Sequence, residues 1–453
     1  MSKPDMSVWS RSVLWLLLAA SLLGCAETTR ETATGKGNIR GVNAVVDVID
    51  LNFLIEERSL GVLNYKNGSA ARRFDDLDYL FNFDIAIPGQ ADTQRIASVA
   101  QKITTDNDYV FVVAGFVASP DTFVWESVER EWTGTETVFE MSFAHLDKTL
   151  GEVDVYFALA GTVPVAGNQV GTIDYGEIID VSEYEAEQYE LIITAPNQPL
   201  VVKYSGIPFT NPAGQTSVSM ILTADPSITG TVSVRQLLPA GDTFEIPDAR
   251  FAPTIQLINA SLEAGNVDLV IDDDFVNPPT VSDLAFGLVP TDVEVPAGTN
   301  PYTYTAPADT TPLLEQITSI AAGSRVVLFL HGDLSTLAAT ILTSQRRTIS
   351  TEARIRFTNT SFNNDGLDLF FAPTDLEFAD IFPIARLALG DTTNYISRAA
   401  NSFDITITAV GDKETILSGP TTIDLENGDI IEVVILDNVD PAIVDLLIYT
   451  NLL

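Results

Sequence analysis

Short stretches in which apolar and polar residues alternate run along most of the chain. Examples are GEVDVYFALAG (151–161), YELIITAP (189–196) and FDITITAV (403–410). Alternation with period two, punctuated by turn residues about every 8–12 positions, predicts short β-strands. Two stretches, DTQRIASVAQKI (92–103) and TTPLLEQITSIAAG (310–323), also resemble amphipathic helices, and we interpret both as strand plus turn.

The strand pattern repeats four times. Each copy opens with an apolar residue and an aspartate: Ile49-Asp50, Val153-Asp154, Val267-Asp268 and Leu367-Asp368, at intervals of 104, 114 and 100 residues. A second anchor follows in each copy: LNYKNG at Leu63, IDYGEI at Ile173, LAFGLV at Leu284 and LALGDT at Leu387. Several anchors in one order at one period indicate tandem modules.

The predicted fold is all-β, with four tandem modules at 37–137, 138–248, 249–350 and 351–453. About seven short strands in roughly 100 residues suit an immunoglobulin-like β-sandwich. We expect the modules to form a rod or a bent array whose shape is set by the junctions.

The N-terminus predicts export. Lys3 and Arg11 precede VLWLLLAASLLG (13–24), an apolar run typical of a signal peptide and too short to span a membrane. Cys25, the only cysteine, follows LLG and resembles the lipidated cysteine of bacterial lipoproteins. The resemblance implies a signal peptide at 1–24, a lipidated Cys25 and a flexible tether at 25–36. Ala26 after the cysteine favours the outer membrane, with either the periplasmic or the outer face open.

The acidity changes the expected partners. The chain has 62 Asp and Glu against 24 Lys and Arg, a net charge of −38. Nucleic acid is excluded as a partner because phosphate contacts need a basic surface. We therefore expect contact with the membrane only through the lipid, and a carbohydrate or a protein as ligand.

The motifs resemble the bacterial domain-of-unknown-function family 4397. The similarity lies in FAHLDKTLGEVDVYF, LINASLEAGNVDLVI and LAFGLVPTDVEVPAGTNPYTYTA. The first module departs most, with Lys66 where the others have Gly176, Gly287 and Gly390. The resemblance implies a β-rich extracytoplasmic module and no activity.

Polar residues repeat at fixed places. Asp154, Asp268 and Asp368 each follow His145, Asn259 or Asn359 by nine residues. A turn residue and a carboxylate could form a small ligand site in each module. We favour a structural role, in which both side chains bind nearby backbone.

Few residues are candidates for metal binding, catalysis or ligand binding. No cofactor is required, but calcium could bind the carboxylates of Asp272, Asp273 and Asp274. His145 and His331 lie in different modules and outside any serine–histidine motif. Trp125 and Trp132 could stack on a sugar or, as we favour, pack under a module junction.

These observations predict a non-catalytic envelope lipoprotein with a role in binding, adhesion or display. An alternative is a structural component that assembles through open sheet edges. A glycoside hydrolase using two carboxylates is a further alternative, although no pair stands out by spacing.

Overall fold

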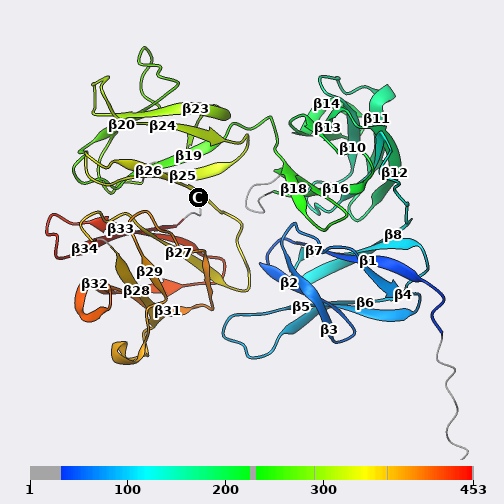
Figure 1. Ribbon diagram of the computed structural model, residues 1–453, viewed down its shortest axis with the longest axis horizontal. Coiled ribbons are helices and arrows are strands. Elements are labelled where there is room, and N and C mark those ends of the chain that lie inside the picture. Colours follow the sequence, from blue (N-terminus) through cyan, green and yellow to red (C-terminus); the bar gives the residue numbers. More distant parts are fainter. Residues whose placement is uncertain (1–31, 225–230, 290, 365, 451–453) are drawn as a thin grey trace, which may run out of the picture.

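The computed structural model describes residues 32–224, 231–289, 291–364 and 366–450, and strands dominate this part of the chain. The strands form eight sheets, two for each of four β-sandwich modules (Figure 1). The prediction of an all-β chain of tandem sandwiches is confirmed. The signal peptide, Cys25 and most of the predicted tether lie outside the described residues.

Module 1 contains two four-stranded sheets, ordered β4-β1-β7-β8 and β3-β2-β5-β6. Its strands are β1 (Lys36–Val45), β2 (Asp50–Ile55), β3 (Arg58–Asn64), β4 (Arg72–Asp75), β5 (Asp78–Ile85), β6 (Gln94–Lys102), β7 (Asn107–Phe116) and β8 (Ser119–Val128).

Modules 3 and 4 repeat this order strand for strand, as β22-β19-β25-β26 with β21-β20-β23-β24 and β30-β27-β33-β34 with β29-β28-β31-β32. Module 3 contains β19 (Thr254–Asn259), β20 (Val267–Ile271), β21 (Val281–Leu284), β22 (Val293–Glu294), β23 (Gly298–Thr305), β24 (Pro312–Ile320), β25 (Arg325–His331) and β26 (Ala338–Thr343). Module 4 contains β27 (Ala353–Asn359), β28 (Leu367–Pro373), the 3₁₀ helix η2 (Phe378–Asp380), β29 (Ala385–Leu387), β30 (Ile396–Arg398), β31 (Asn401–Ala409), β32 (Asp412–Leu425), β33 (Ile430–Asp437) and β34 (Val444–Thr450).

Module 2 keeps the order and extends it, as β12-β9-β16-β17-β18 and β11-β10-β13-β14, with β15 paired to β13. Its elements are β9 (Val138–His145), β10 (Val153–Leu159), η1 (Ala166–Asn168), β11 (Gln169–Ile173), β12 (Ile178–Glu185), β13 (Gln188–Ala195), β14 (Gln198–Ser205), β15 (Phe209–Thr210), β16 (Thr216–Thr223), β17 (Val232–Leu237) and β18 (Thr243–Ile246).

The shared order differs in detail from that of an immunoglobulin domain. Each module has at least eight strands rather than the expected seven or so. Its first and second strands lie in opposite sheets, whereas they pair in one sheet of an immunoglobulin domain. The first strand also runs parallel to the seventh, as β1 does to β7. The two stretches with helical periodicity are strands, β6 and β24.

The seventh strands of modules 1 and 3, β7 and β25, are apolar on both faces because both faces are buried. In β7, Phe111 and Val113 face the core of module 1, whereas Val110 and Val112 face module 2. Met220 of β16 lies on the other side of that junction. Such a near-continuous apolar run is typical of strands covered on both sides.

The modules therefore pack in pairs, face to face through equivalent sheets. Modules 1 and 2 share one apolar cluster, and modules 3 and 4 share another that includes Ile258, Phe329 and Val434. In Figure 1 the two pairs lie side by side, with modules 1 and 4 adjacent. The expectation of a rod or bent array is wrong, because these sheet faces are too apolar to stay exposed.

An arginine in the connection that leads into module 4 binds the backbone of module 1. Arg347, in the connection between β26 and β27, donates to the carbonyl oxygens of Val46 (2.7 Å) and Val48 (2.6 Å). Its guanidinium lies 4.3 Å from the ring centroid of Tyr65. Ser350 adds a bond from its hydroxyl to the Asp47 carboxylate (2.7 Å).

Candidate functional site

The repeated turn residues bind backbone in every module. Asn359 is fully buried; its Nδ2 donates to the Leu387 carbonyl oxygen (3.1 Å) and its Oδ1 accepts from the Ser361 N–H (3.0 Å). Asn259 makes equivalent bonds to Leu284 and Ser261. These bonds tie the end of the first strand to the third strand.

Module 2 uses a histidine at this place. His145 Nε2 lies 2.8 Å from the Gly151 carbonyl oxygen, and Nδ1 accepts from the Asp147 N–H (3.2 Å). Burial lowers the pKa of His145 below its usual value. The neutral imidazole thus binds the connection between the first two strands, as the Asn259 amide does at the Gly265 carbonyl oxygen (2.6 Å), but it does not reproduce the bond to the third strand. Module 1 has Asn43, which donates to the Leu63 carbonyl oxygen (2.9 Å).

The repeated aspartates tie the turn between the fifth and sixth strands to the second strand. Their carboxylates accept from the N–H of Asn197 in module 2 (Asp154, 2.7 Å), Ala308 in module 3 (Asp268, 3.4 Å) and Gly411 in module 4 (Asp368, 2.7 Å). All three donors have positive φ. Each carboxylate thus stabilises a tight turn, and the turn residue and the aspartate serve separate contacts.

The second anchor requires a left-handed backbone. Gly176, Gly287 and Gly390 have φ of 86°, 71° and 81°, and each N–H donates to the carbonyl oxygen of the repeated turn residue. Lys66 in module 1 makes the same bond at φ 66°. Glycine adopts this conformation freely, whereas lysine does so at a cost.

Two of the three consecutive aspartates bind different partners. Asp273 accepts from the Thr303 hydroxyl (2.8 Å), and Asp274 accepts from the Asn277 side chain (2.7 Å). Among the described residues, no group of three or more His, Cys, Asp or Glu side chains is placed to hold a metal ion. Calcium binding at Asp272–Asp274 stays a prediction, which thermal melting with and without millimolar calcium tests.

The remaining candidates lie at module junctions. Trp125 is 8% exposed and packs in the cluster between modules 1 and 2, whereas Trp132 is half-buried under the guanidinium of Arg130 (3.9 Å). His331 Nε2 lies 2.8 Å from the Thr340 hydroxyl and faces Gly390 of module 4. None of these residues lines either of the two hollows described below.

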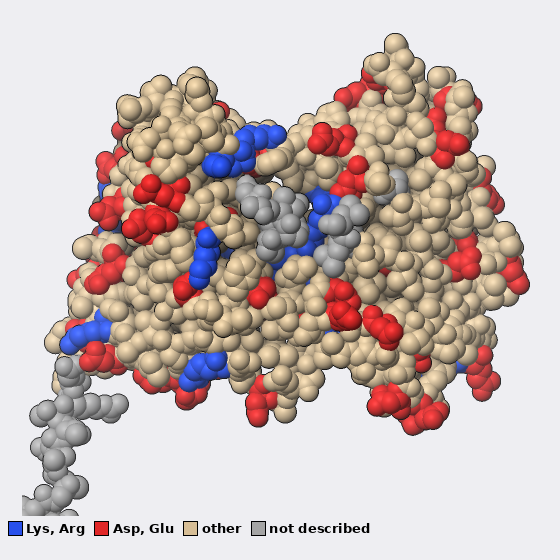
Figure 2. Space-filling model, turned by 180° about the vertical axis from the view of Figure 1, so that it is seen from behind, with Lys and Arg blue, Asp and Glu red and all other residues tan. Residues whose placement is uncertain are grey.

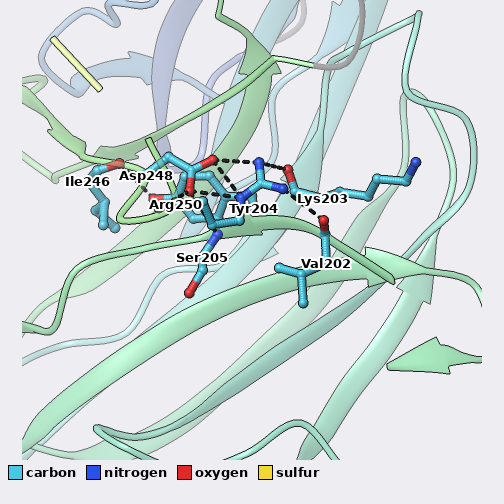
Figure 3. A network of polar contacts seen from close by, with 7 residues as sticks. All are labelled: Val202, Lys203, Tyr204, Ser205, Ile246, Asp248 and Arg250. Carbon is cyan, nitrogen blue, oxygen red and sulfur yellow. Dashed lines mark hydrogen bonds and ion pairs between the residues drawn. The ribbon is translucent and has the colours of Figure 1, made fainter. Parts of the chain in front are cut away.

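A network of polar contacts at the end of module 2, which joins the exposed Arg250 to the buried Asp248, is also structural (Figure 3). Arg250 donates through Nε to both carboxylate oxygens of Asp248 (3.0 and 3.1 Å) and through Nη1 to the Val202 carbonyl oxygen (2.7 Å). The Tyr204 hydroxyl donates to the Ile246 carbonyl oxygen (2.6 Å). These bonds fix the start of the connection to module 3 against β14.

A groove of about 500 Å³ lies between modules 1 and 4. Module 1 contributes Pro88 and Gly89, from the turn between β5 and β6. Module 4 contributes the rest of the lining: Phe371, Ala372, Pro373, Leu376, Ser397, Arg398, Ala399, Ala400, Asn401 and Phe403. The volume of the groove falls in the range of small-molecule sites, its lining is mostly apolar with a few polar groups, and it is open to solvent.

The groove has an aromatic base and one cation. The rings of Phe371 and Phe403 stack with centroids 4.8 Å apart. The guanidinium of Arg398 lies 5.4 Å from the Phe371 ring centroid, within the range of a cation–π contact. No feature of the repeats indicated this groove, because it forms only where the first and fourth modules meet.

A second hollow lies on the outer sheet of module 1 and contains Glu56 and Asp78. The Glu56 carboxylate accepts from the Leu80 N–H (2.9 Å), so it serves the backbone of β5. The hydrolase alternative requires two carboxylates that flank one bond, and it stays a prediction.

The fold and the groove define a class: a protein of four paired β-sandwich modules with an inter-module groove. Residues 253–370, which span module 3 and the first two strands of module 4, match the domain of unknown function DUF4397. The predicted resemblance to this family is confirmed for that stretch. No curated protein matches the chain.

Two solved structures show weak similarity. The Bacillus anthracis TIE protein is 10% identical, with 90% of this chain and 69% of that chain covered, at a TM-score of 0.15. A family 26 carbohydrate-binding module from Eubacterium rectale Amy13K, in complex with maltoheptaose, is 11% identical, with 44% and 95% covered, also at 0.15. Because both TM-scores are this low, neither similarity supports a conclusion about function.

Proposed function

We propose that this chain is a lipid-anchored, non-catalytic binding protein of the bacterial cell envelope. Cys25 carries the lipid, the tether gives reach, and the four modules act as one body held to the outer membrane. The motif around Cys25 supports the anchor, and the commitment of the repeated polar residues to backbone contacts supports a role without catalysis.

The groove between modules 1 and 4 carries the binding role. Gly89 and Phe371 line it together although they are far apart in the chain. Their meeting depends on the two paired units and on the contacts of Arg347 with module 1. A site built jointly by two modules explains why the ends of the array are brought together.

The assembly alternative is less well supported by the sheet edges. The sixth strand of every module is an edge strand, and each carries charges or proline. Examples are Arg95 in β6, Pro199 in β14, Glu315 in β24 and Pro420 in β32. Such residues discourage pairing of one edge with another.

The anchor is tested by metabolic labelling with palmitate in a bacterial host. The full chain should incorporate label and fractionate with membranes, and the Cys25→Ser variant should do neither. An unlabelled full chain would refute the anchor and leave the groove untouched.

The binding role is tested by a thermal-shift screen of the mature chain carrying Cys25→Ser. The panel contains neutral oligosaccharides, peptides and small organic acids. Groove ligands should raise the melting temperature of this chain and not that of Ala400→Trp, in which a large side chain fills the groove from an exposed position. We call a ligand Ala400-sensitive if it raises the melting temperature of this chain and not that of Ala400→Trp. If the panel contains no such ligand, the proposed site is refuted.

A further inference from the structure

The lining of the groove contrasts with the rest of this acidic chain. Asp and Glu side chains are spread over the whole face seen in Figure 2, whereas several Lys and Arg side chains gather near its middle. The groove between modules 1 and 4 has no Asp or Glu in its lining, and Arg398 is its one charged residue.

Arg398 lacks an acidic partner. Within the described part of the chain it makes one hydrogen bond, from Nη1 to the Ser397 carbonyl oxygen (3.0 Å), and no ion pair. Burial lowers its pKa, and no carboxylate acts against that effect. Nearby, Arg386 is paired with Asp368 (2.9 Å), and this partner raises the pKa of Arg386.

The neighbouring residues keep the guanidinium in place. Arg398 ends β30, and its planar group lies near Phe371. The Ser397 hydroxyl is already committed to the Glu352 carboxylate (3.0 Å), so it does not compete for a ligand. A positioned guanidinium beside apolar walls offers parallel N–H donors to a planar anion.

We propose that the groove binds an organic monocarboxylate with an apolar, ring-containing body, whose carboxylate pairs with Arg398. This inference rests on the proposed binding function and names the ligand class for the same groove. The body of the ligand lies among Pro373, Leu376 and Phe403. A dianionic phosphate fits less well, because the groove supplies a single cation and little other polar surface.

The test uses 2-naphthoate and its neutral analogue 2-naphthamide with the mature chain carrying Cys25→Ser, measured by isothermal titration calorimetry. We expect naphthoate to bind roughly 10-fold or more tightly than the amide, as for a charge-assisted hydrogen bond. Arg398→Gln should abolish this preference, and Arg398→Lys should keep part of it. Higher salt should weaken naphthoate binding and leave the amide unchanged.

Arg72→Gln is the matched control. Arg72 is exposed on β4, so this variant makes the same change in net charge outside the groove. It should leave the preference for naphthoate intact. Equal loss in Arg72→Gln and Arg398→Gln would show a general charge effect and overturn the assignment.

The outcomes separate this inference from the proposed function. If a neutral oligosaccharide or peptide binds in an Ala400-sensitive way and naphthoate does not, the groove is a binding site but the carboxylate class is wrong. If naphthoate binds equally well to Ala400→Trp, the ligand lies elsewhere and the inference fails. If no probe binds at the groove, both proposals fail.

Discussion

Replacing Asn359 by alanine tests whether the repeated turn residue holds each sandwich together. The variant loses both side-chain bonds and leaves the Ser361 N–H and the Leu387 carbonyl oxygen buried without them. A buried polar group without a partner costs about 1–3 kcal/mol. The expected loss in the free energy of unfolding is therefore about 2–4 kcal/mol, after some relaxation of the site.

Hydrogen exchange with mass spectrometry measures this loss module by module. Peptides from β27 and β29 should exchange roughly 30- to 1000-fold faster, since about 1.4 kcal/mol corresponds to tenfold. Peptides from module 2 should be unaffected. Asn394→Ala, at an exposed position of the same module, is the control. Exchange in β27 that matches this control would refute a structural role for the repeated asparagine.

Three further outcomes are expected. Glu432→Gln should lower the free energy of unfolding in urea by about 3–5 kcal/mol, because it leaves the buried Arg356 without its bidentate partner (2.9 and 2.8 Å). The apolar double variant Arg356→Met with Glu432→Leu should recover most of this loss. A loss that the double variant does not recover would contradict the assignment to an unpaired buried charge. Lys66→Gly should raise the free energy of unfolding in urea by about 1 kcal/mol through relief of its left-handed backbone, whereas Gly390→Ala should lower it by a similar amount; the opposite signs would be inconsistent with the strain argument. Between pH 7.5 and 5.5 stability should fall, because burial lowers the pKa of both His145 and His331, so the unfolded chain binds more protons near the ordinary value of about 6.5. His331→Gln should reduce this slope and leave the part due to His145; an unchanged slope would show that His331 does not contribute.

Much of the fold could be predicted from the sequence because each module repeats the same local pattern. The alternation in GEVDVYFALAG predicts β10, and the positions of Asp50, Asp154, Asp268 and Asp368 predict four copies of one unit. The sequence also shows the departure at Lys66, which occupies the position where the other three anchors have glycine. Period and turn chemistry suffice for features that depend on neighbours in sequence.

The arrangement of the modules could not be predicted from the alternation alone. The expectation of a rod treated the second face of each sheet as exposed. The seventh strands carried a contrary signal: YVFVVAG and VVLFLHG are apolar at successive positions, which indicates burial on both faces. The sequence did not single out Arg398. Its role depends on the absence of Asp and Glu from the lining of a groove, and segments far apart in the chain form that groove.

The contacts of Arg347 have a consequence for the order in which the chain folds. Val46 and Val48 are synthesised early, but the guanidinium that donates to their carbonyl oxygens lies about 300 residues later in the chain. Module 1 can therefore form its own two sheets early, yet its contacts with the connection to module 4 must wait for most of the polypeptide. A chain that ends before module 4 would leave apolar sheet faces exposed to solvent.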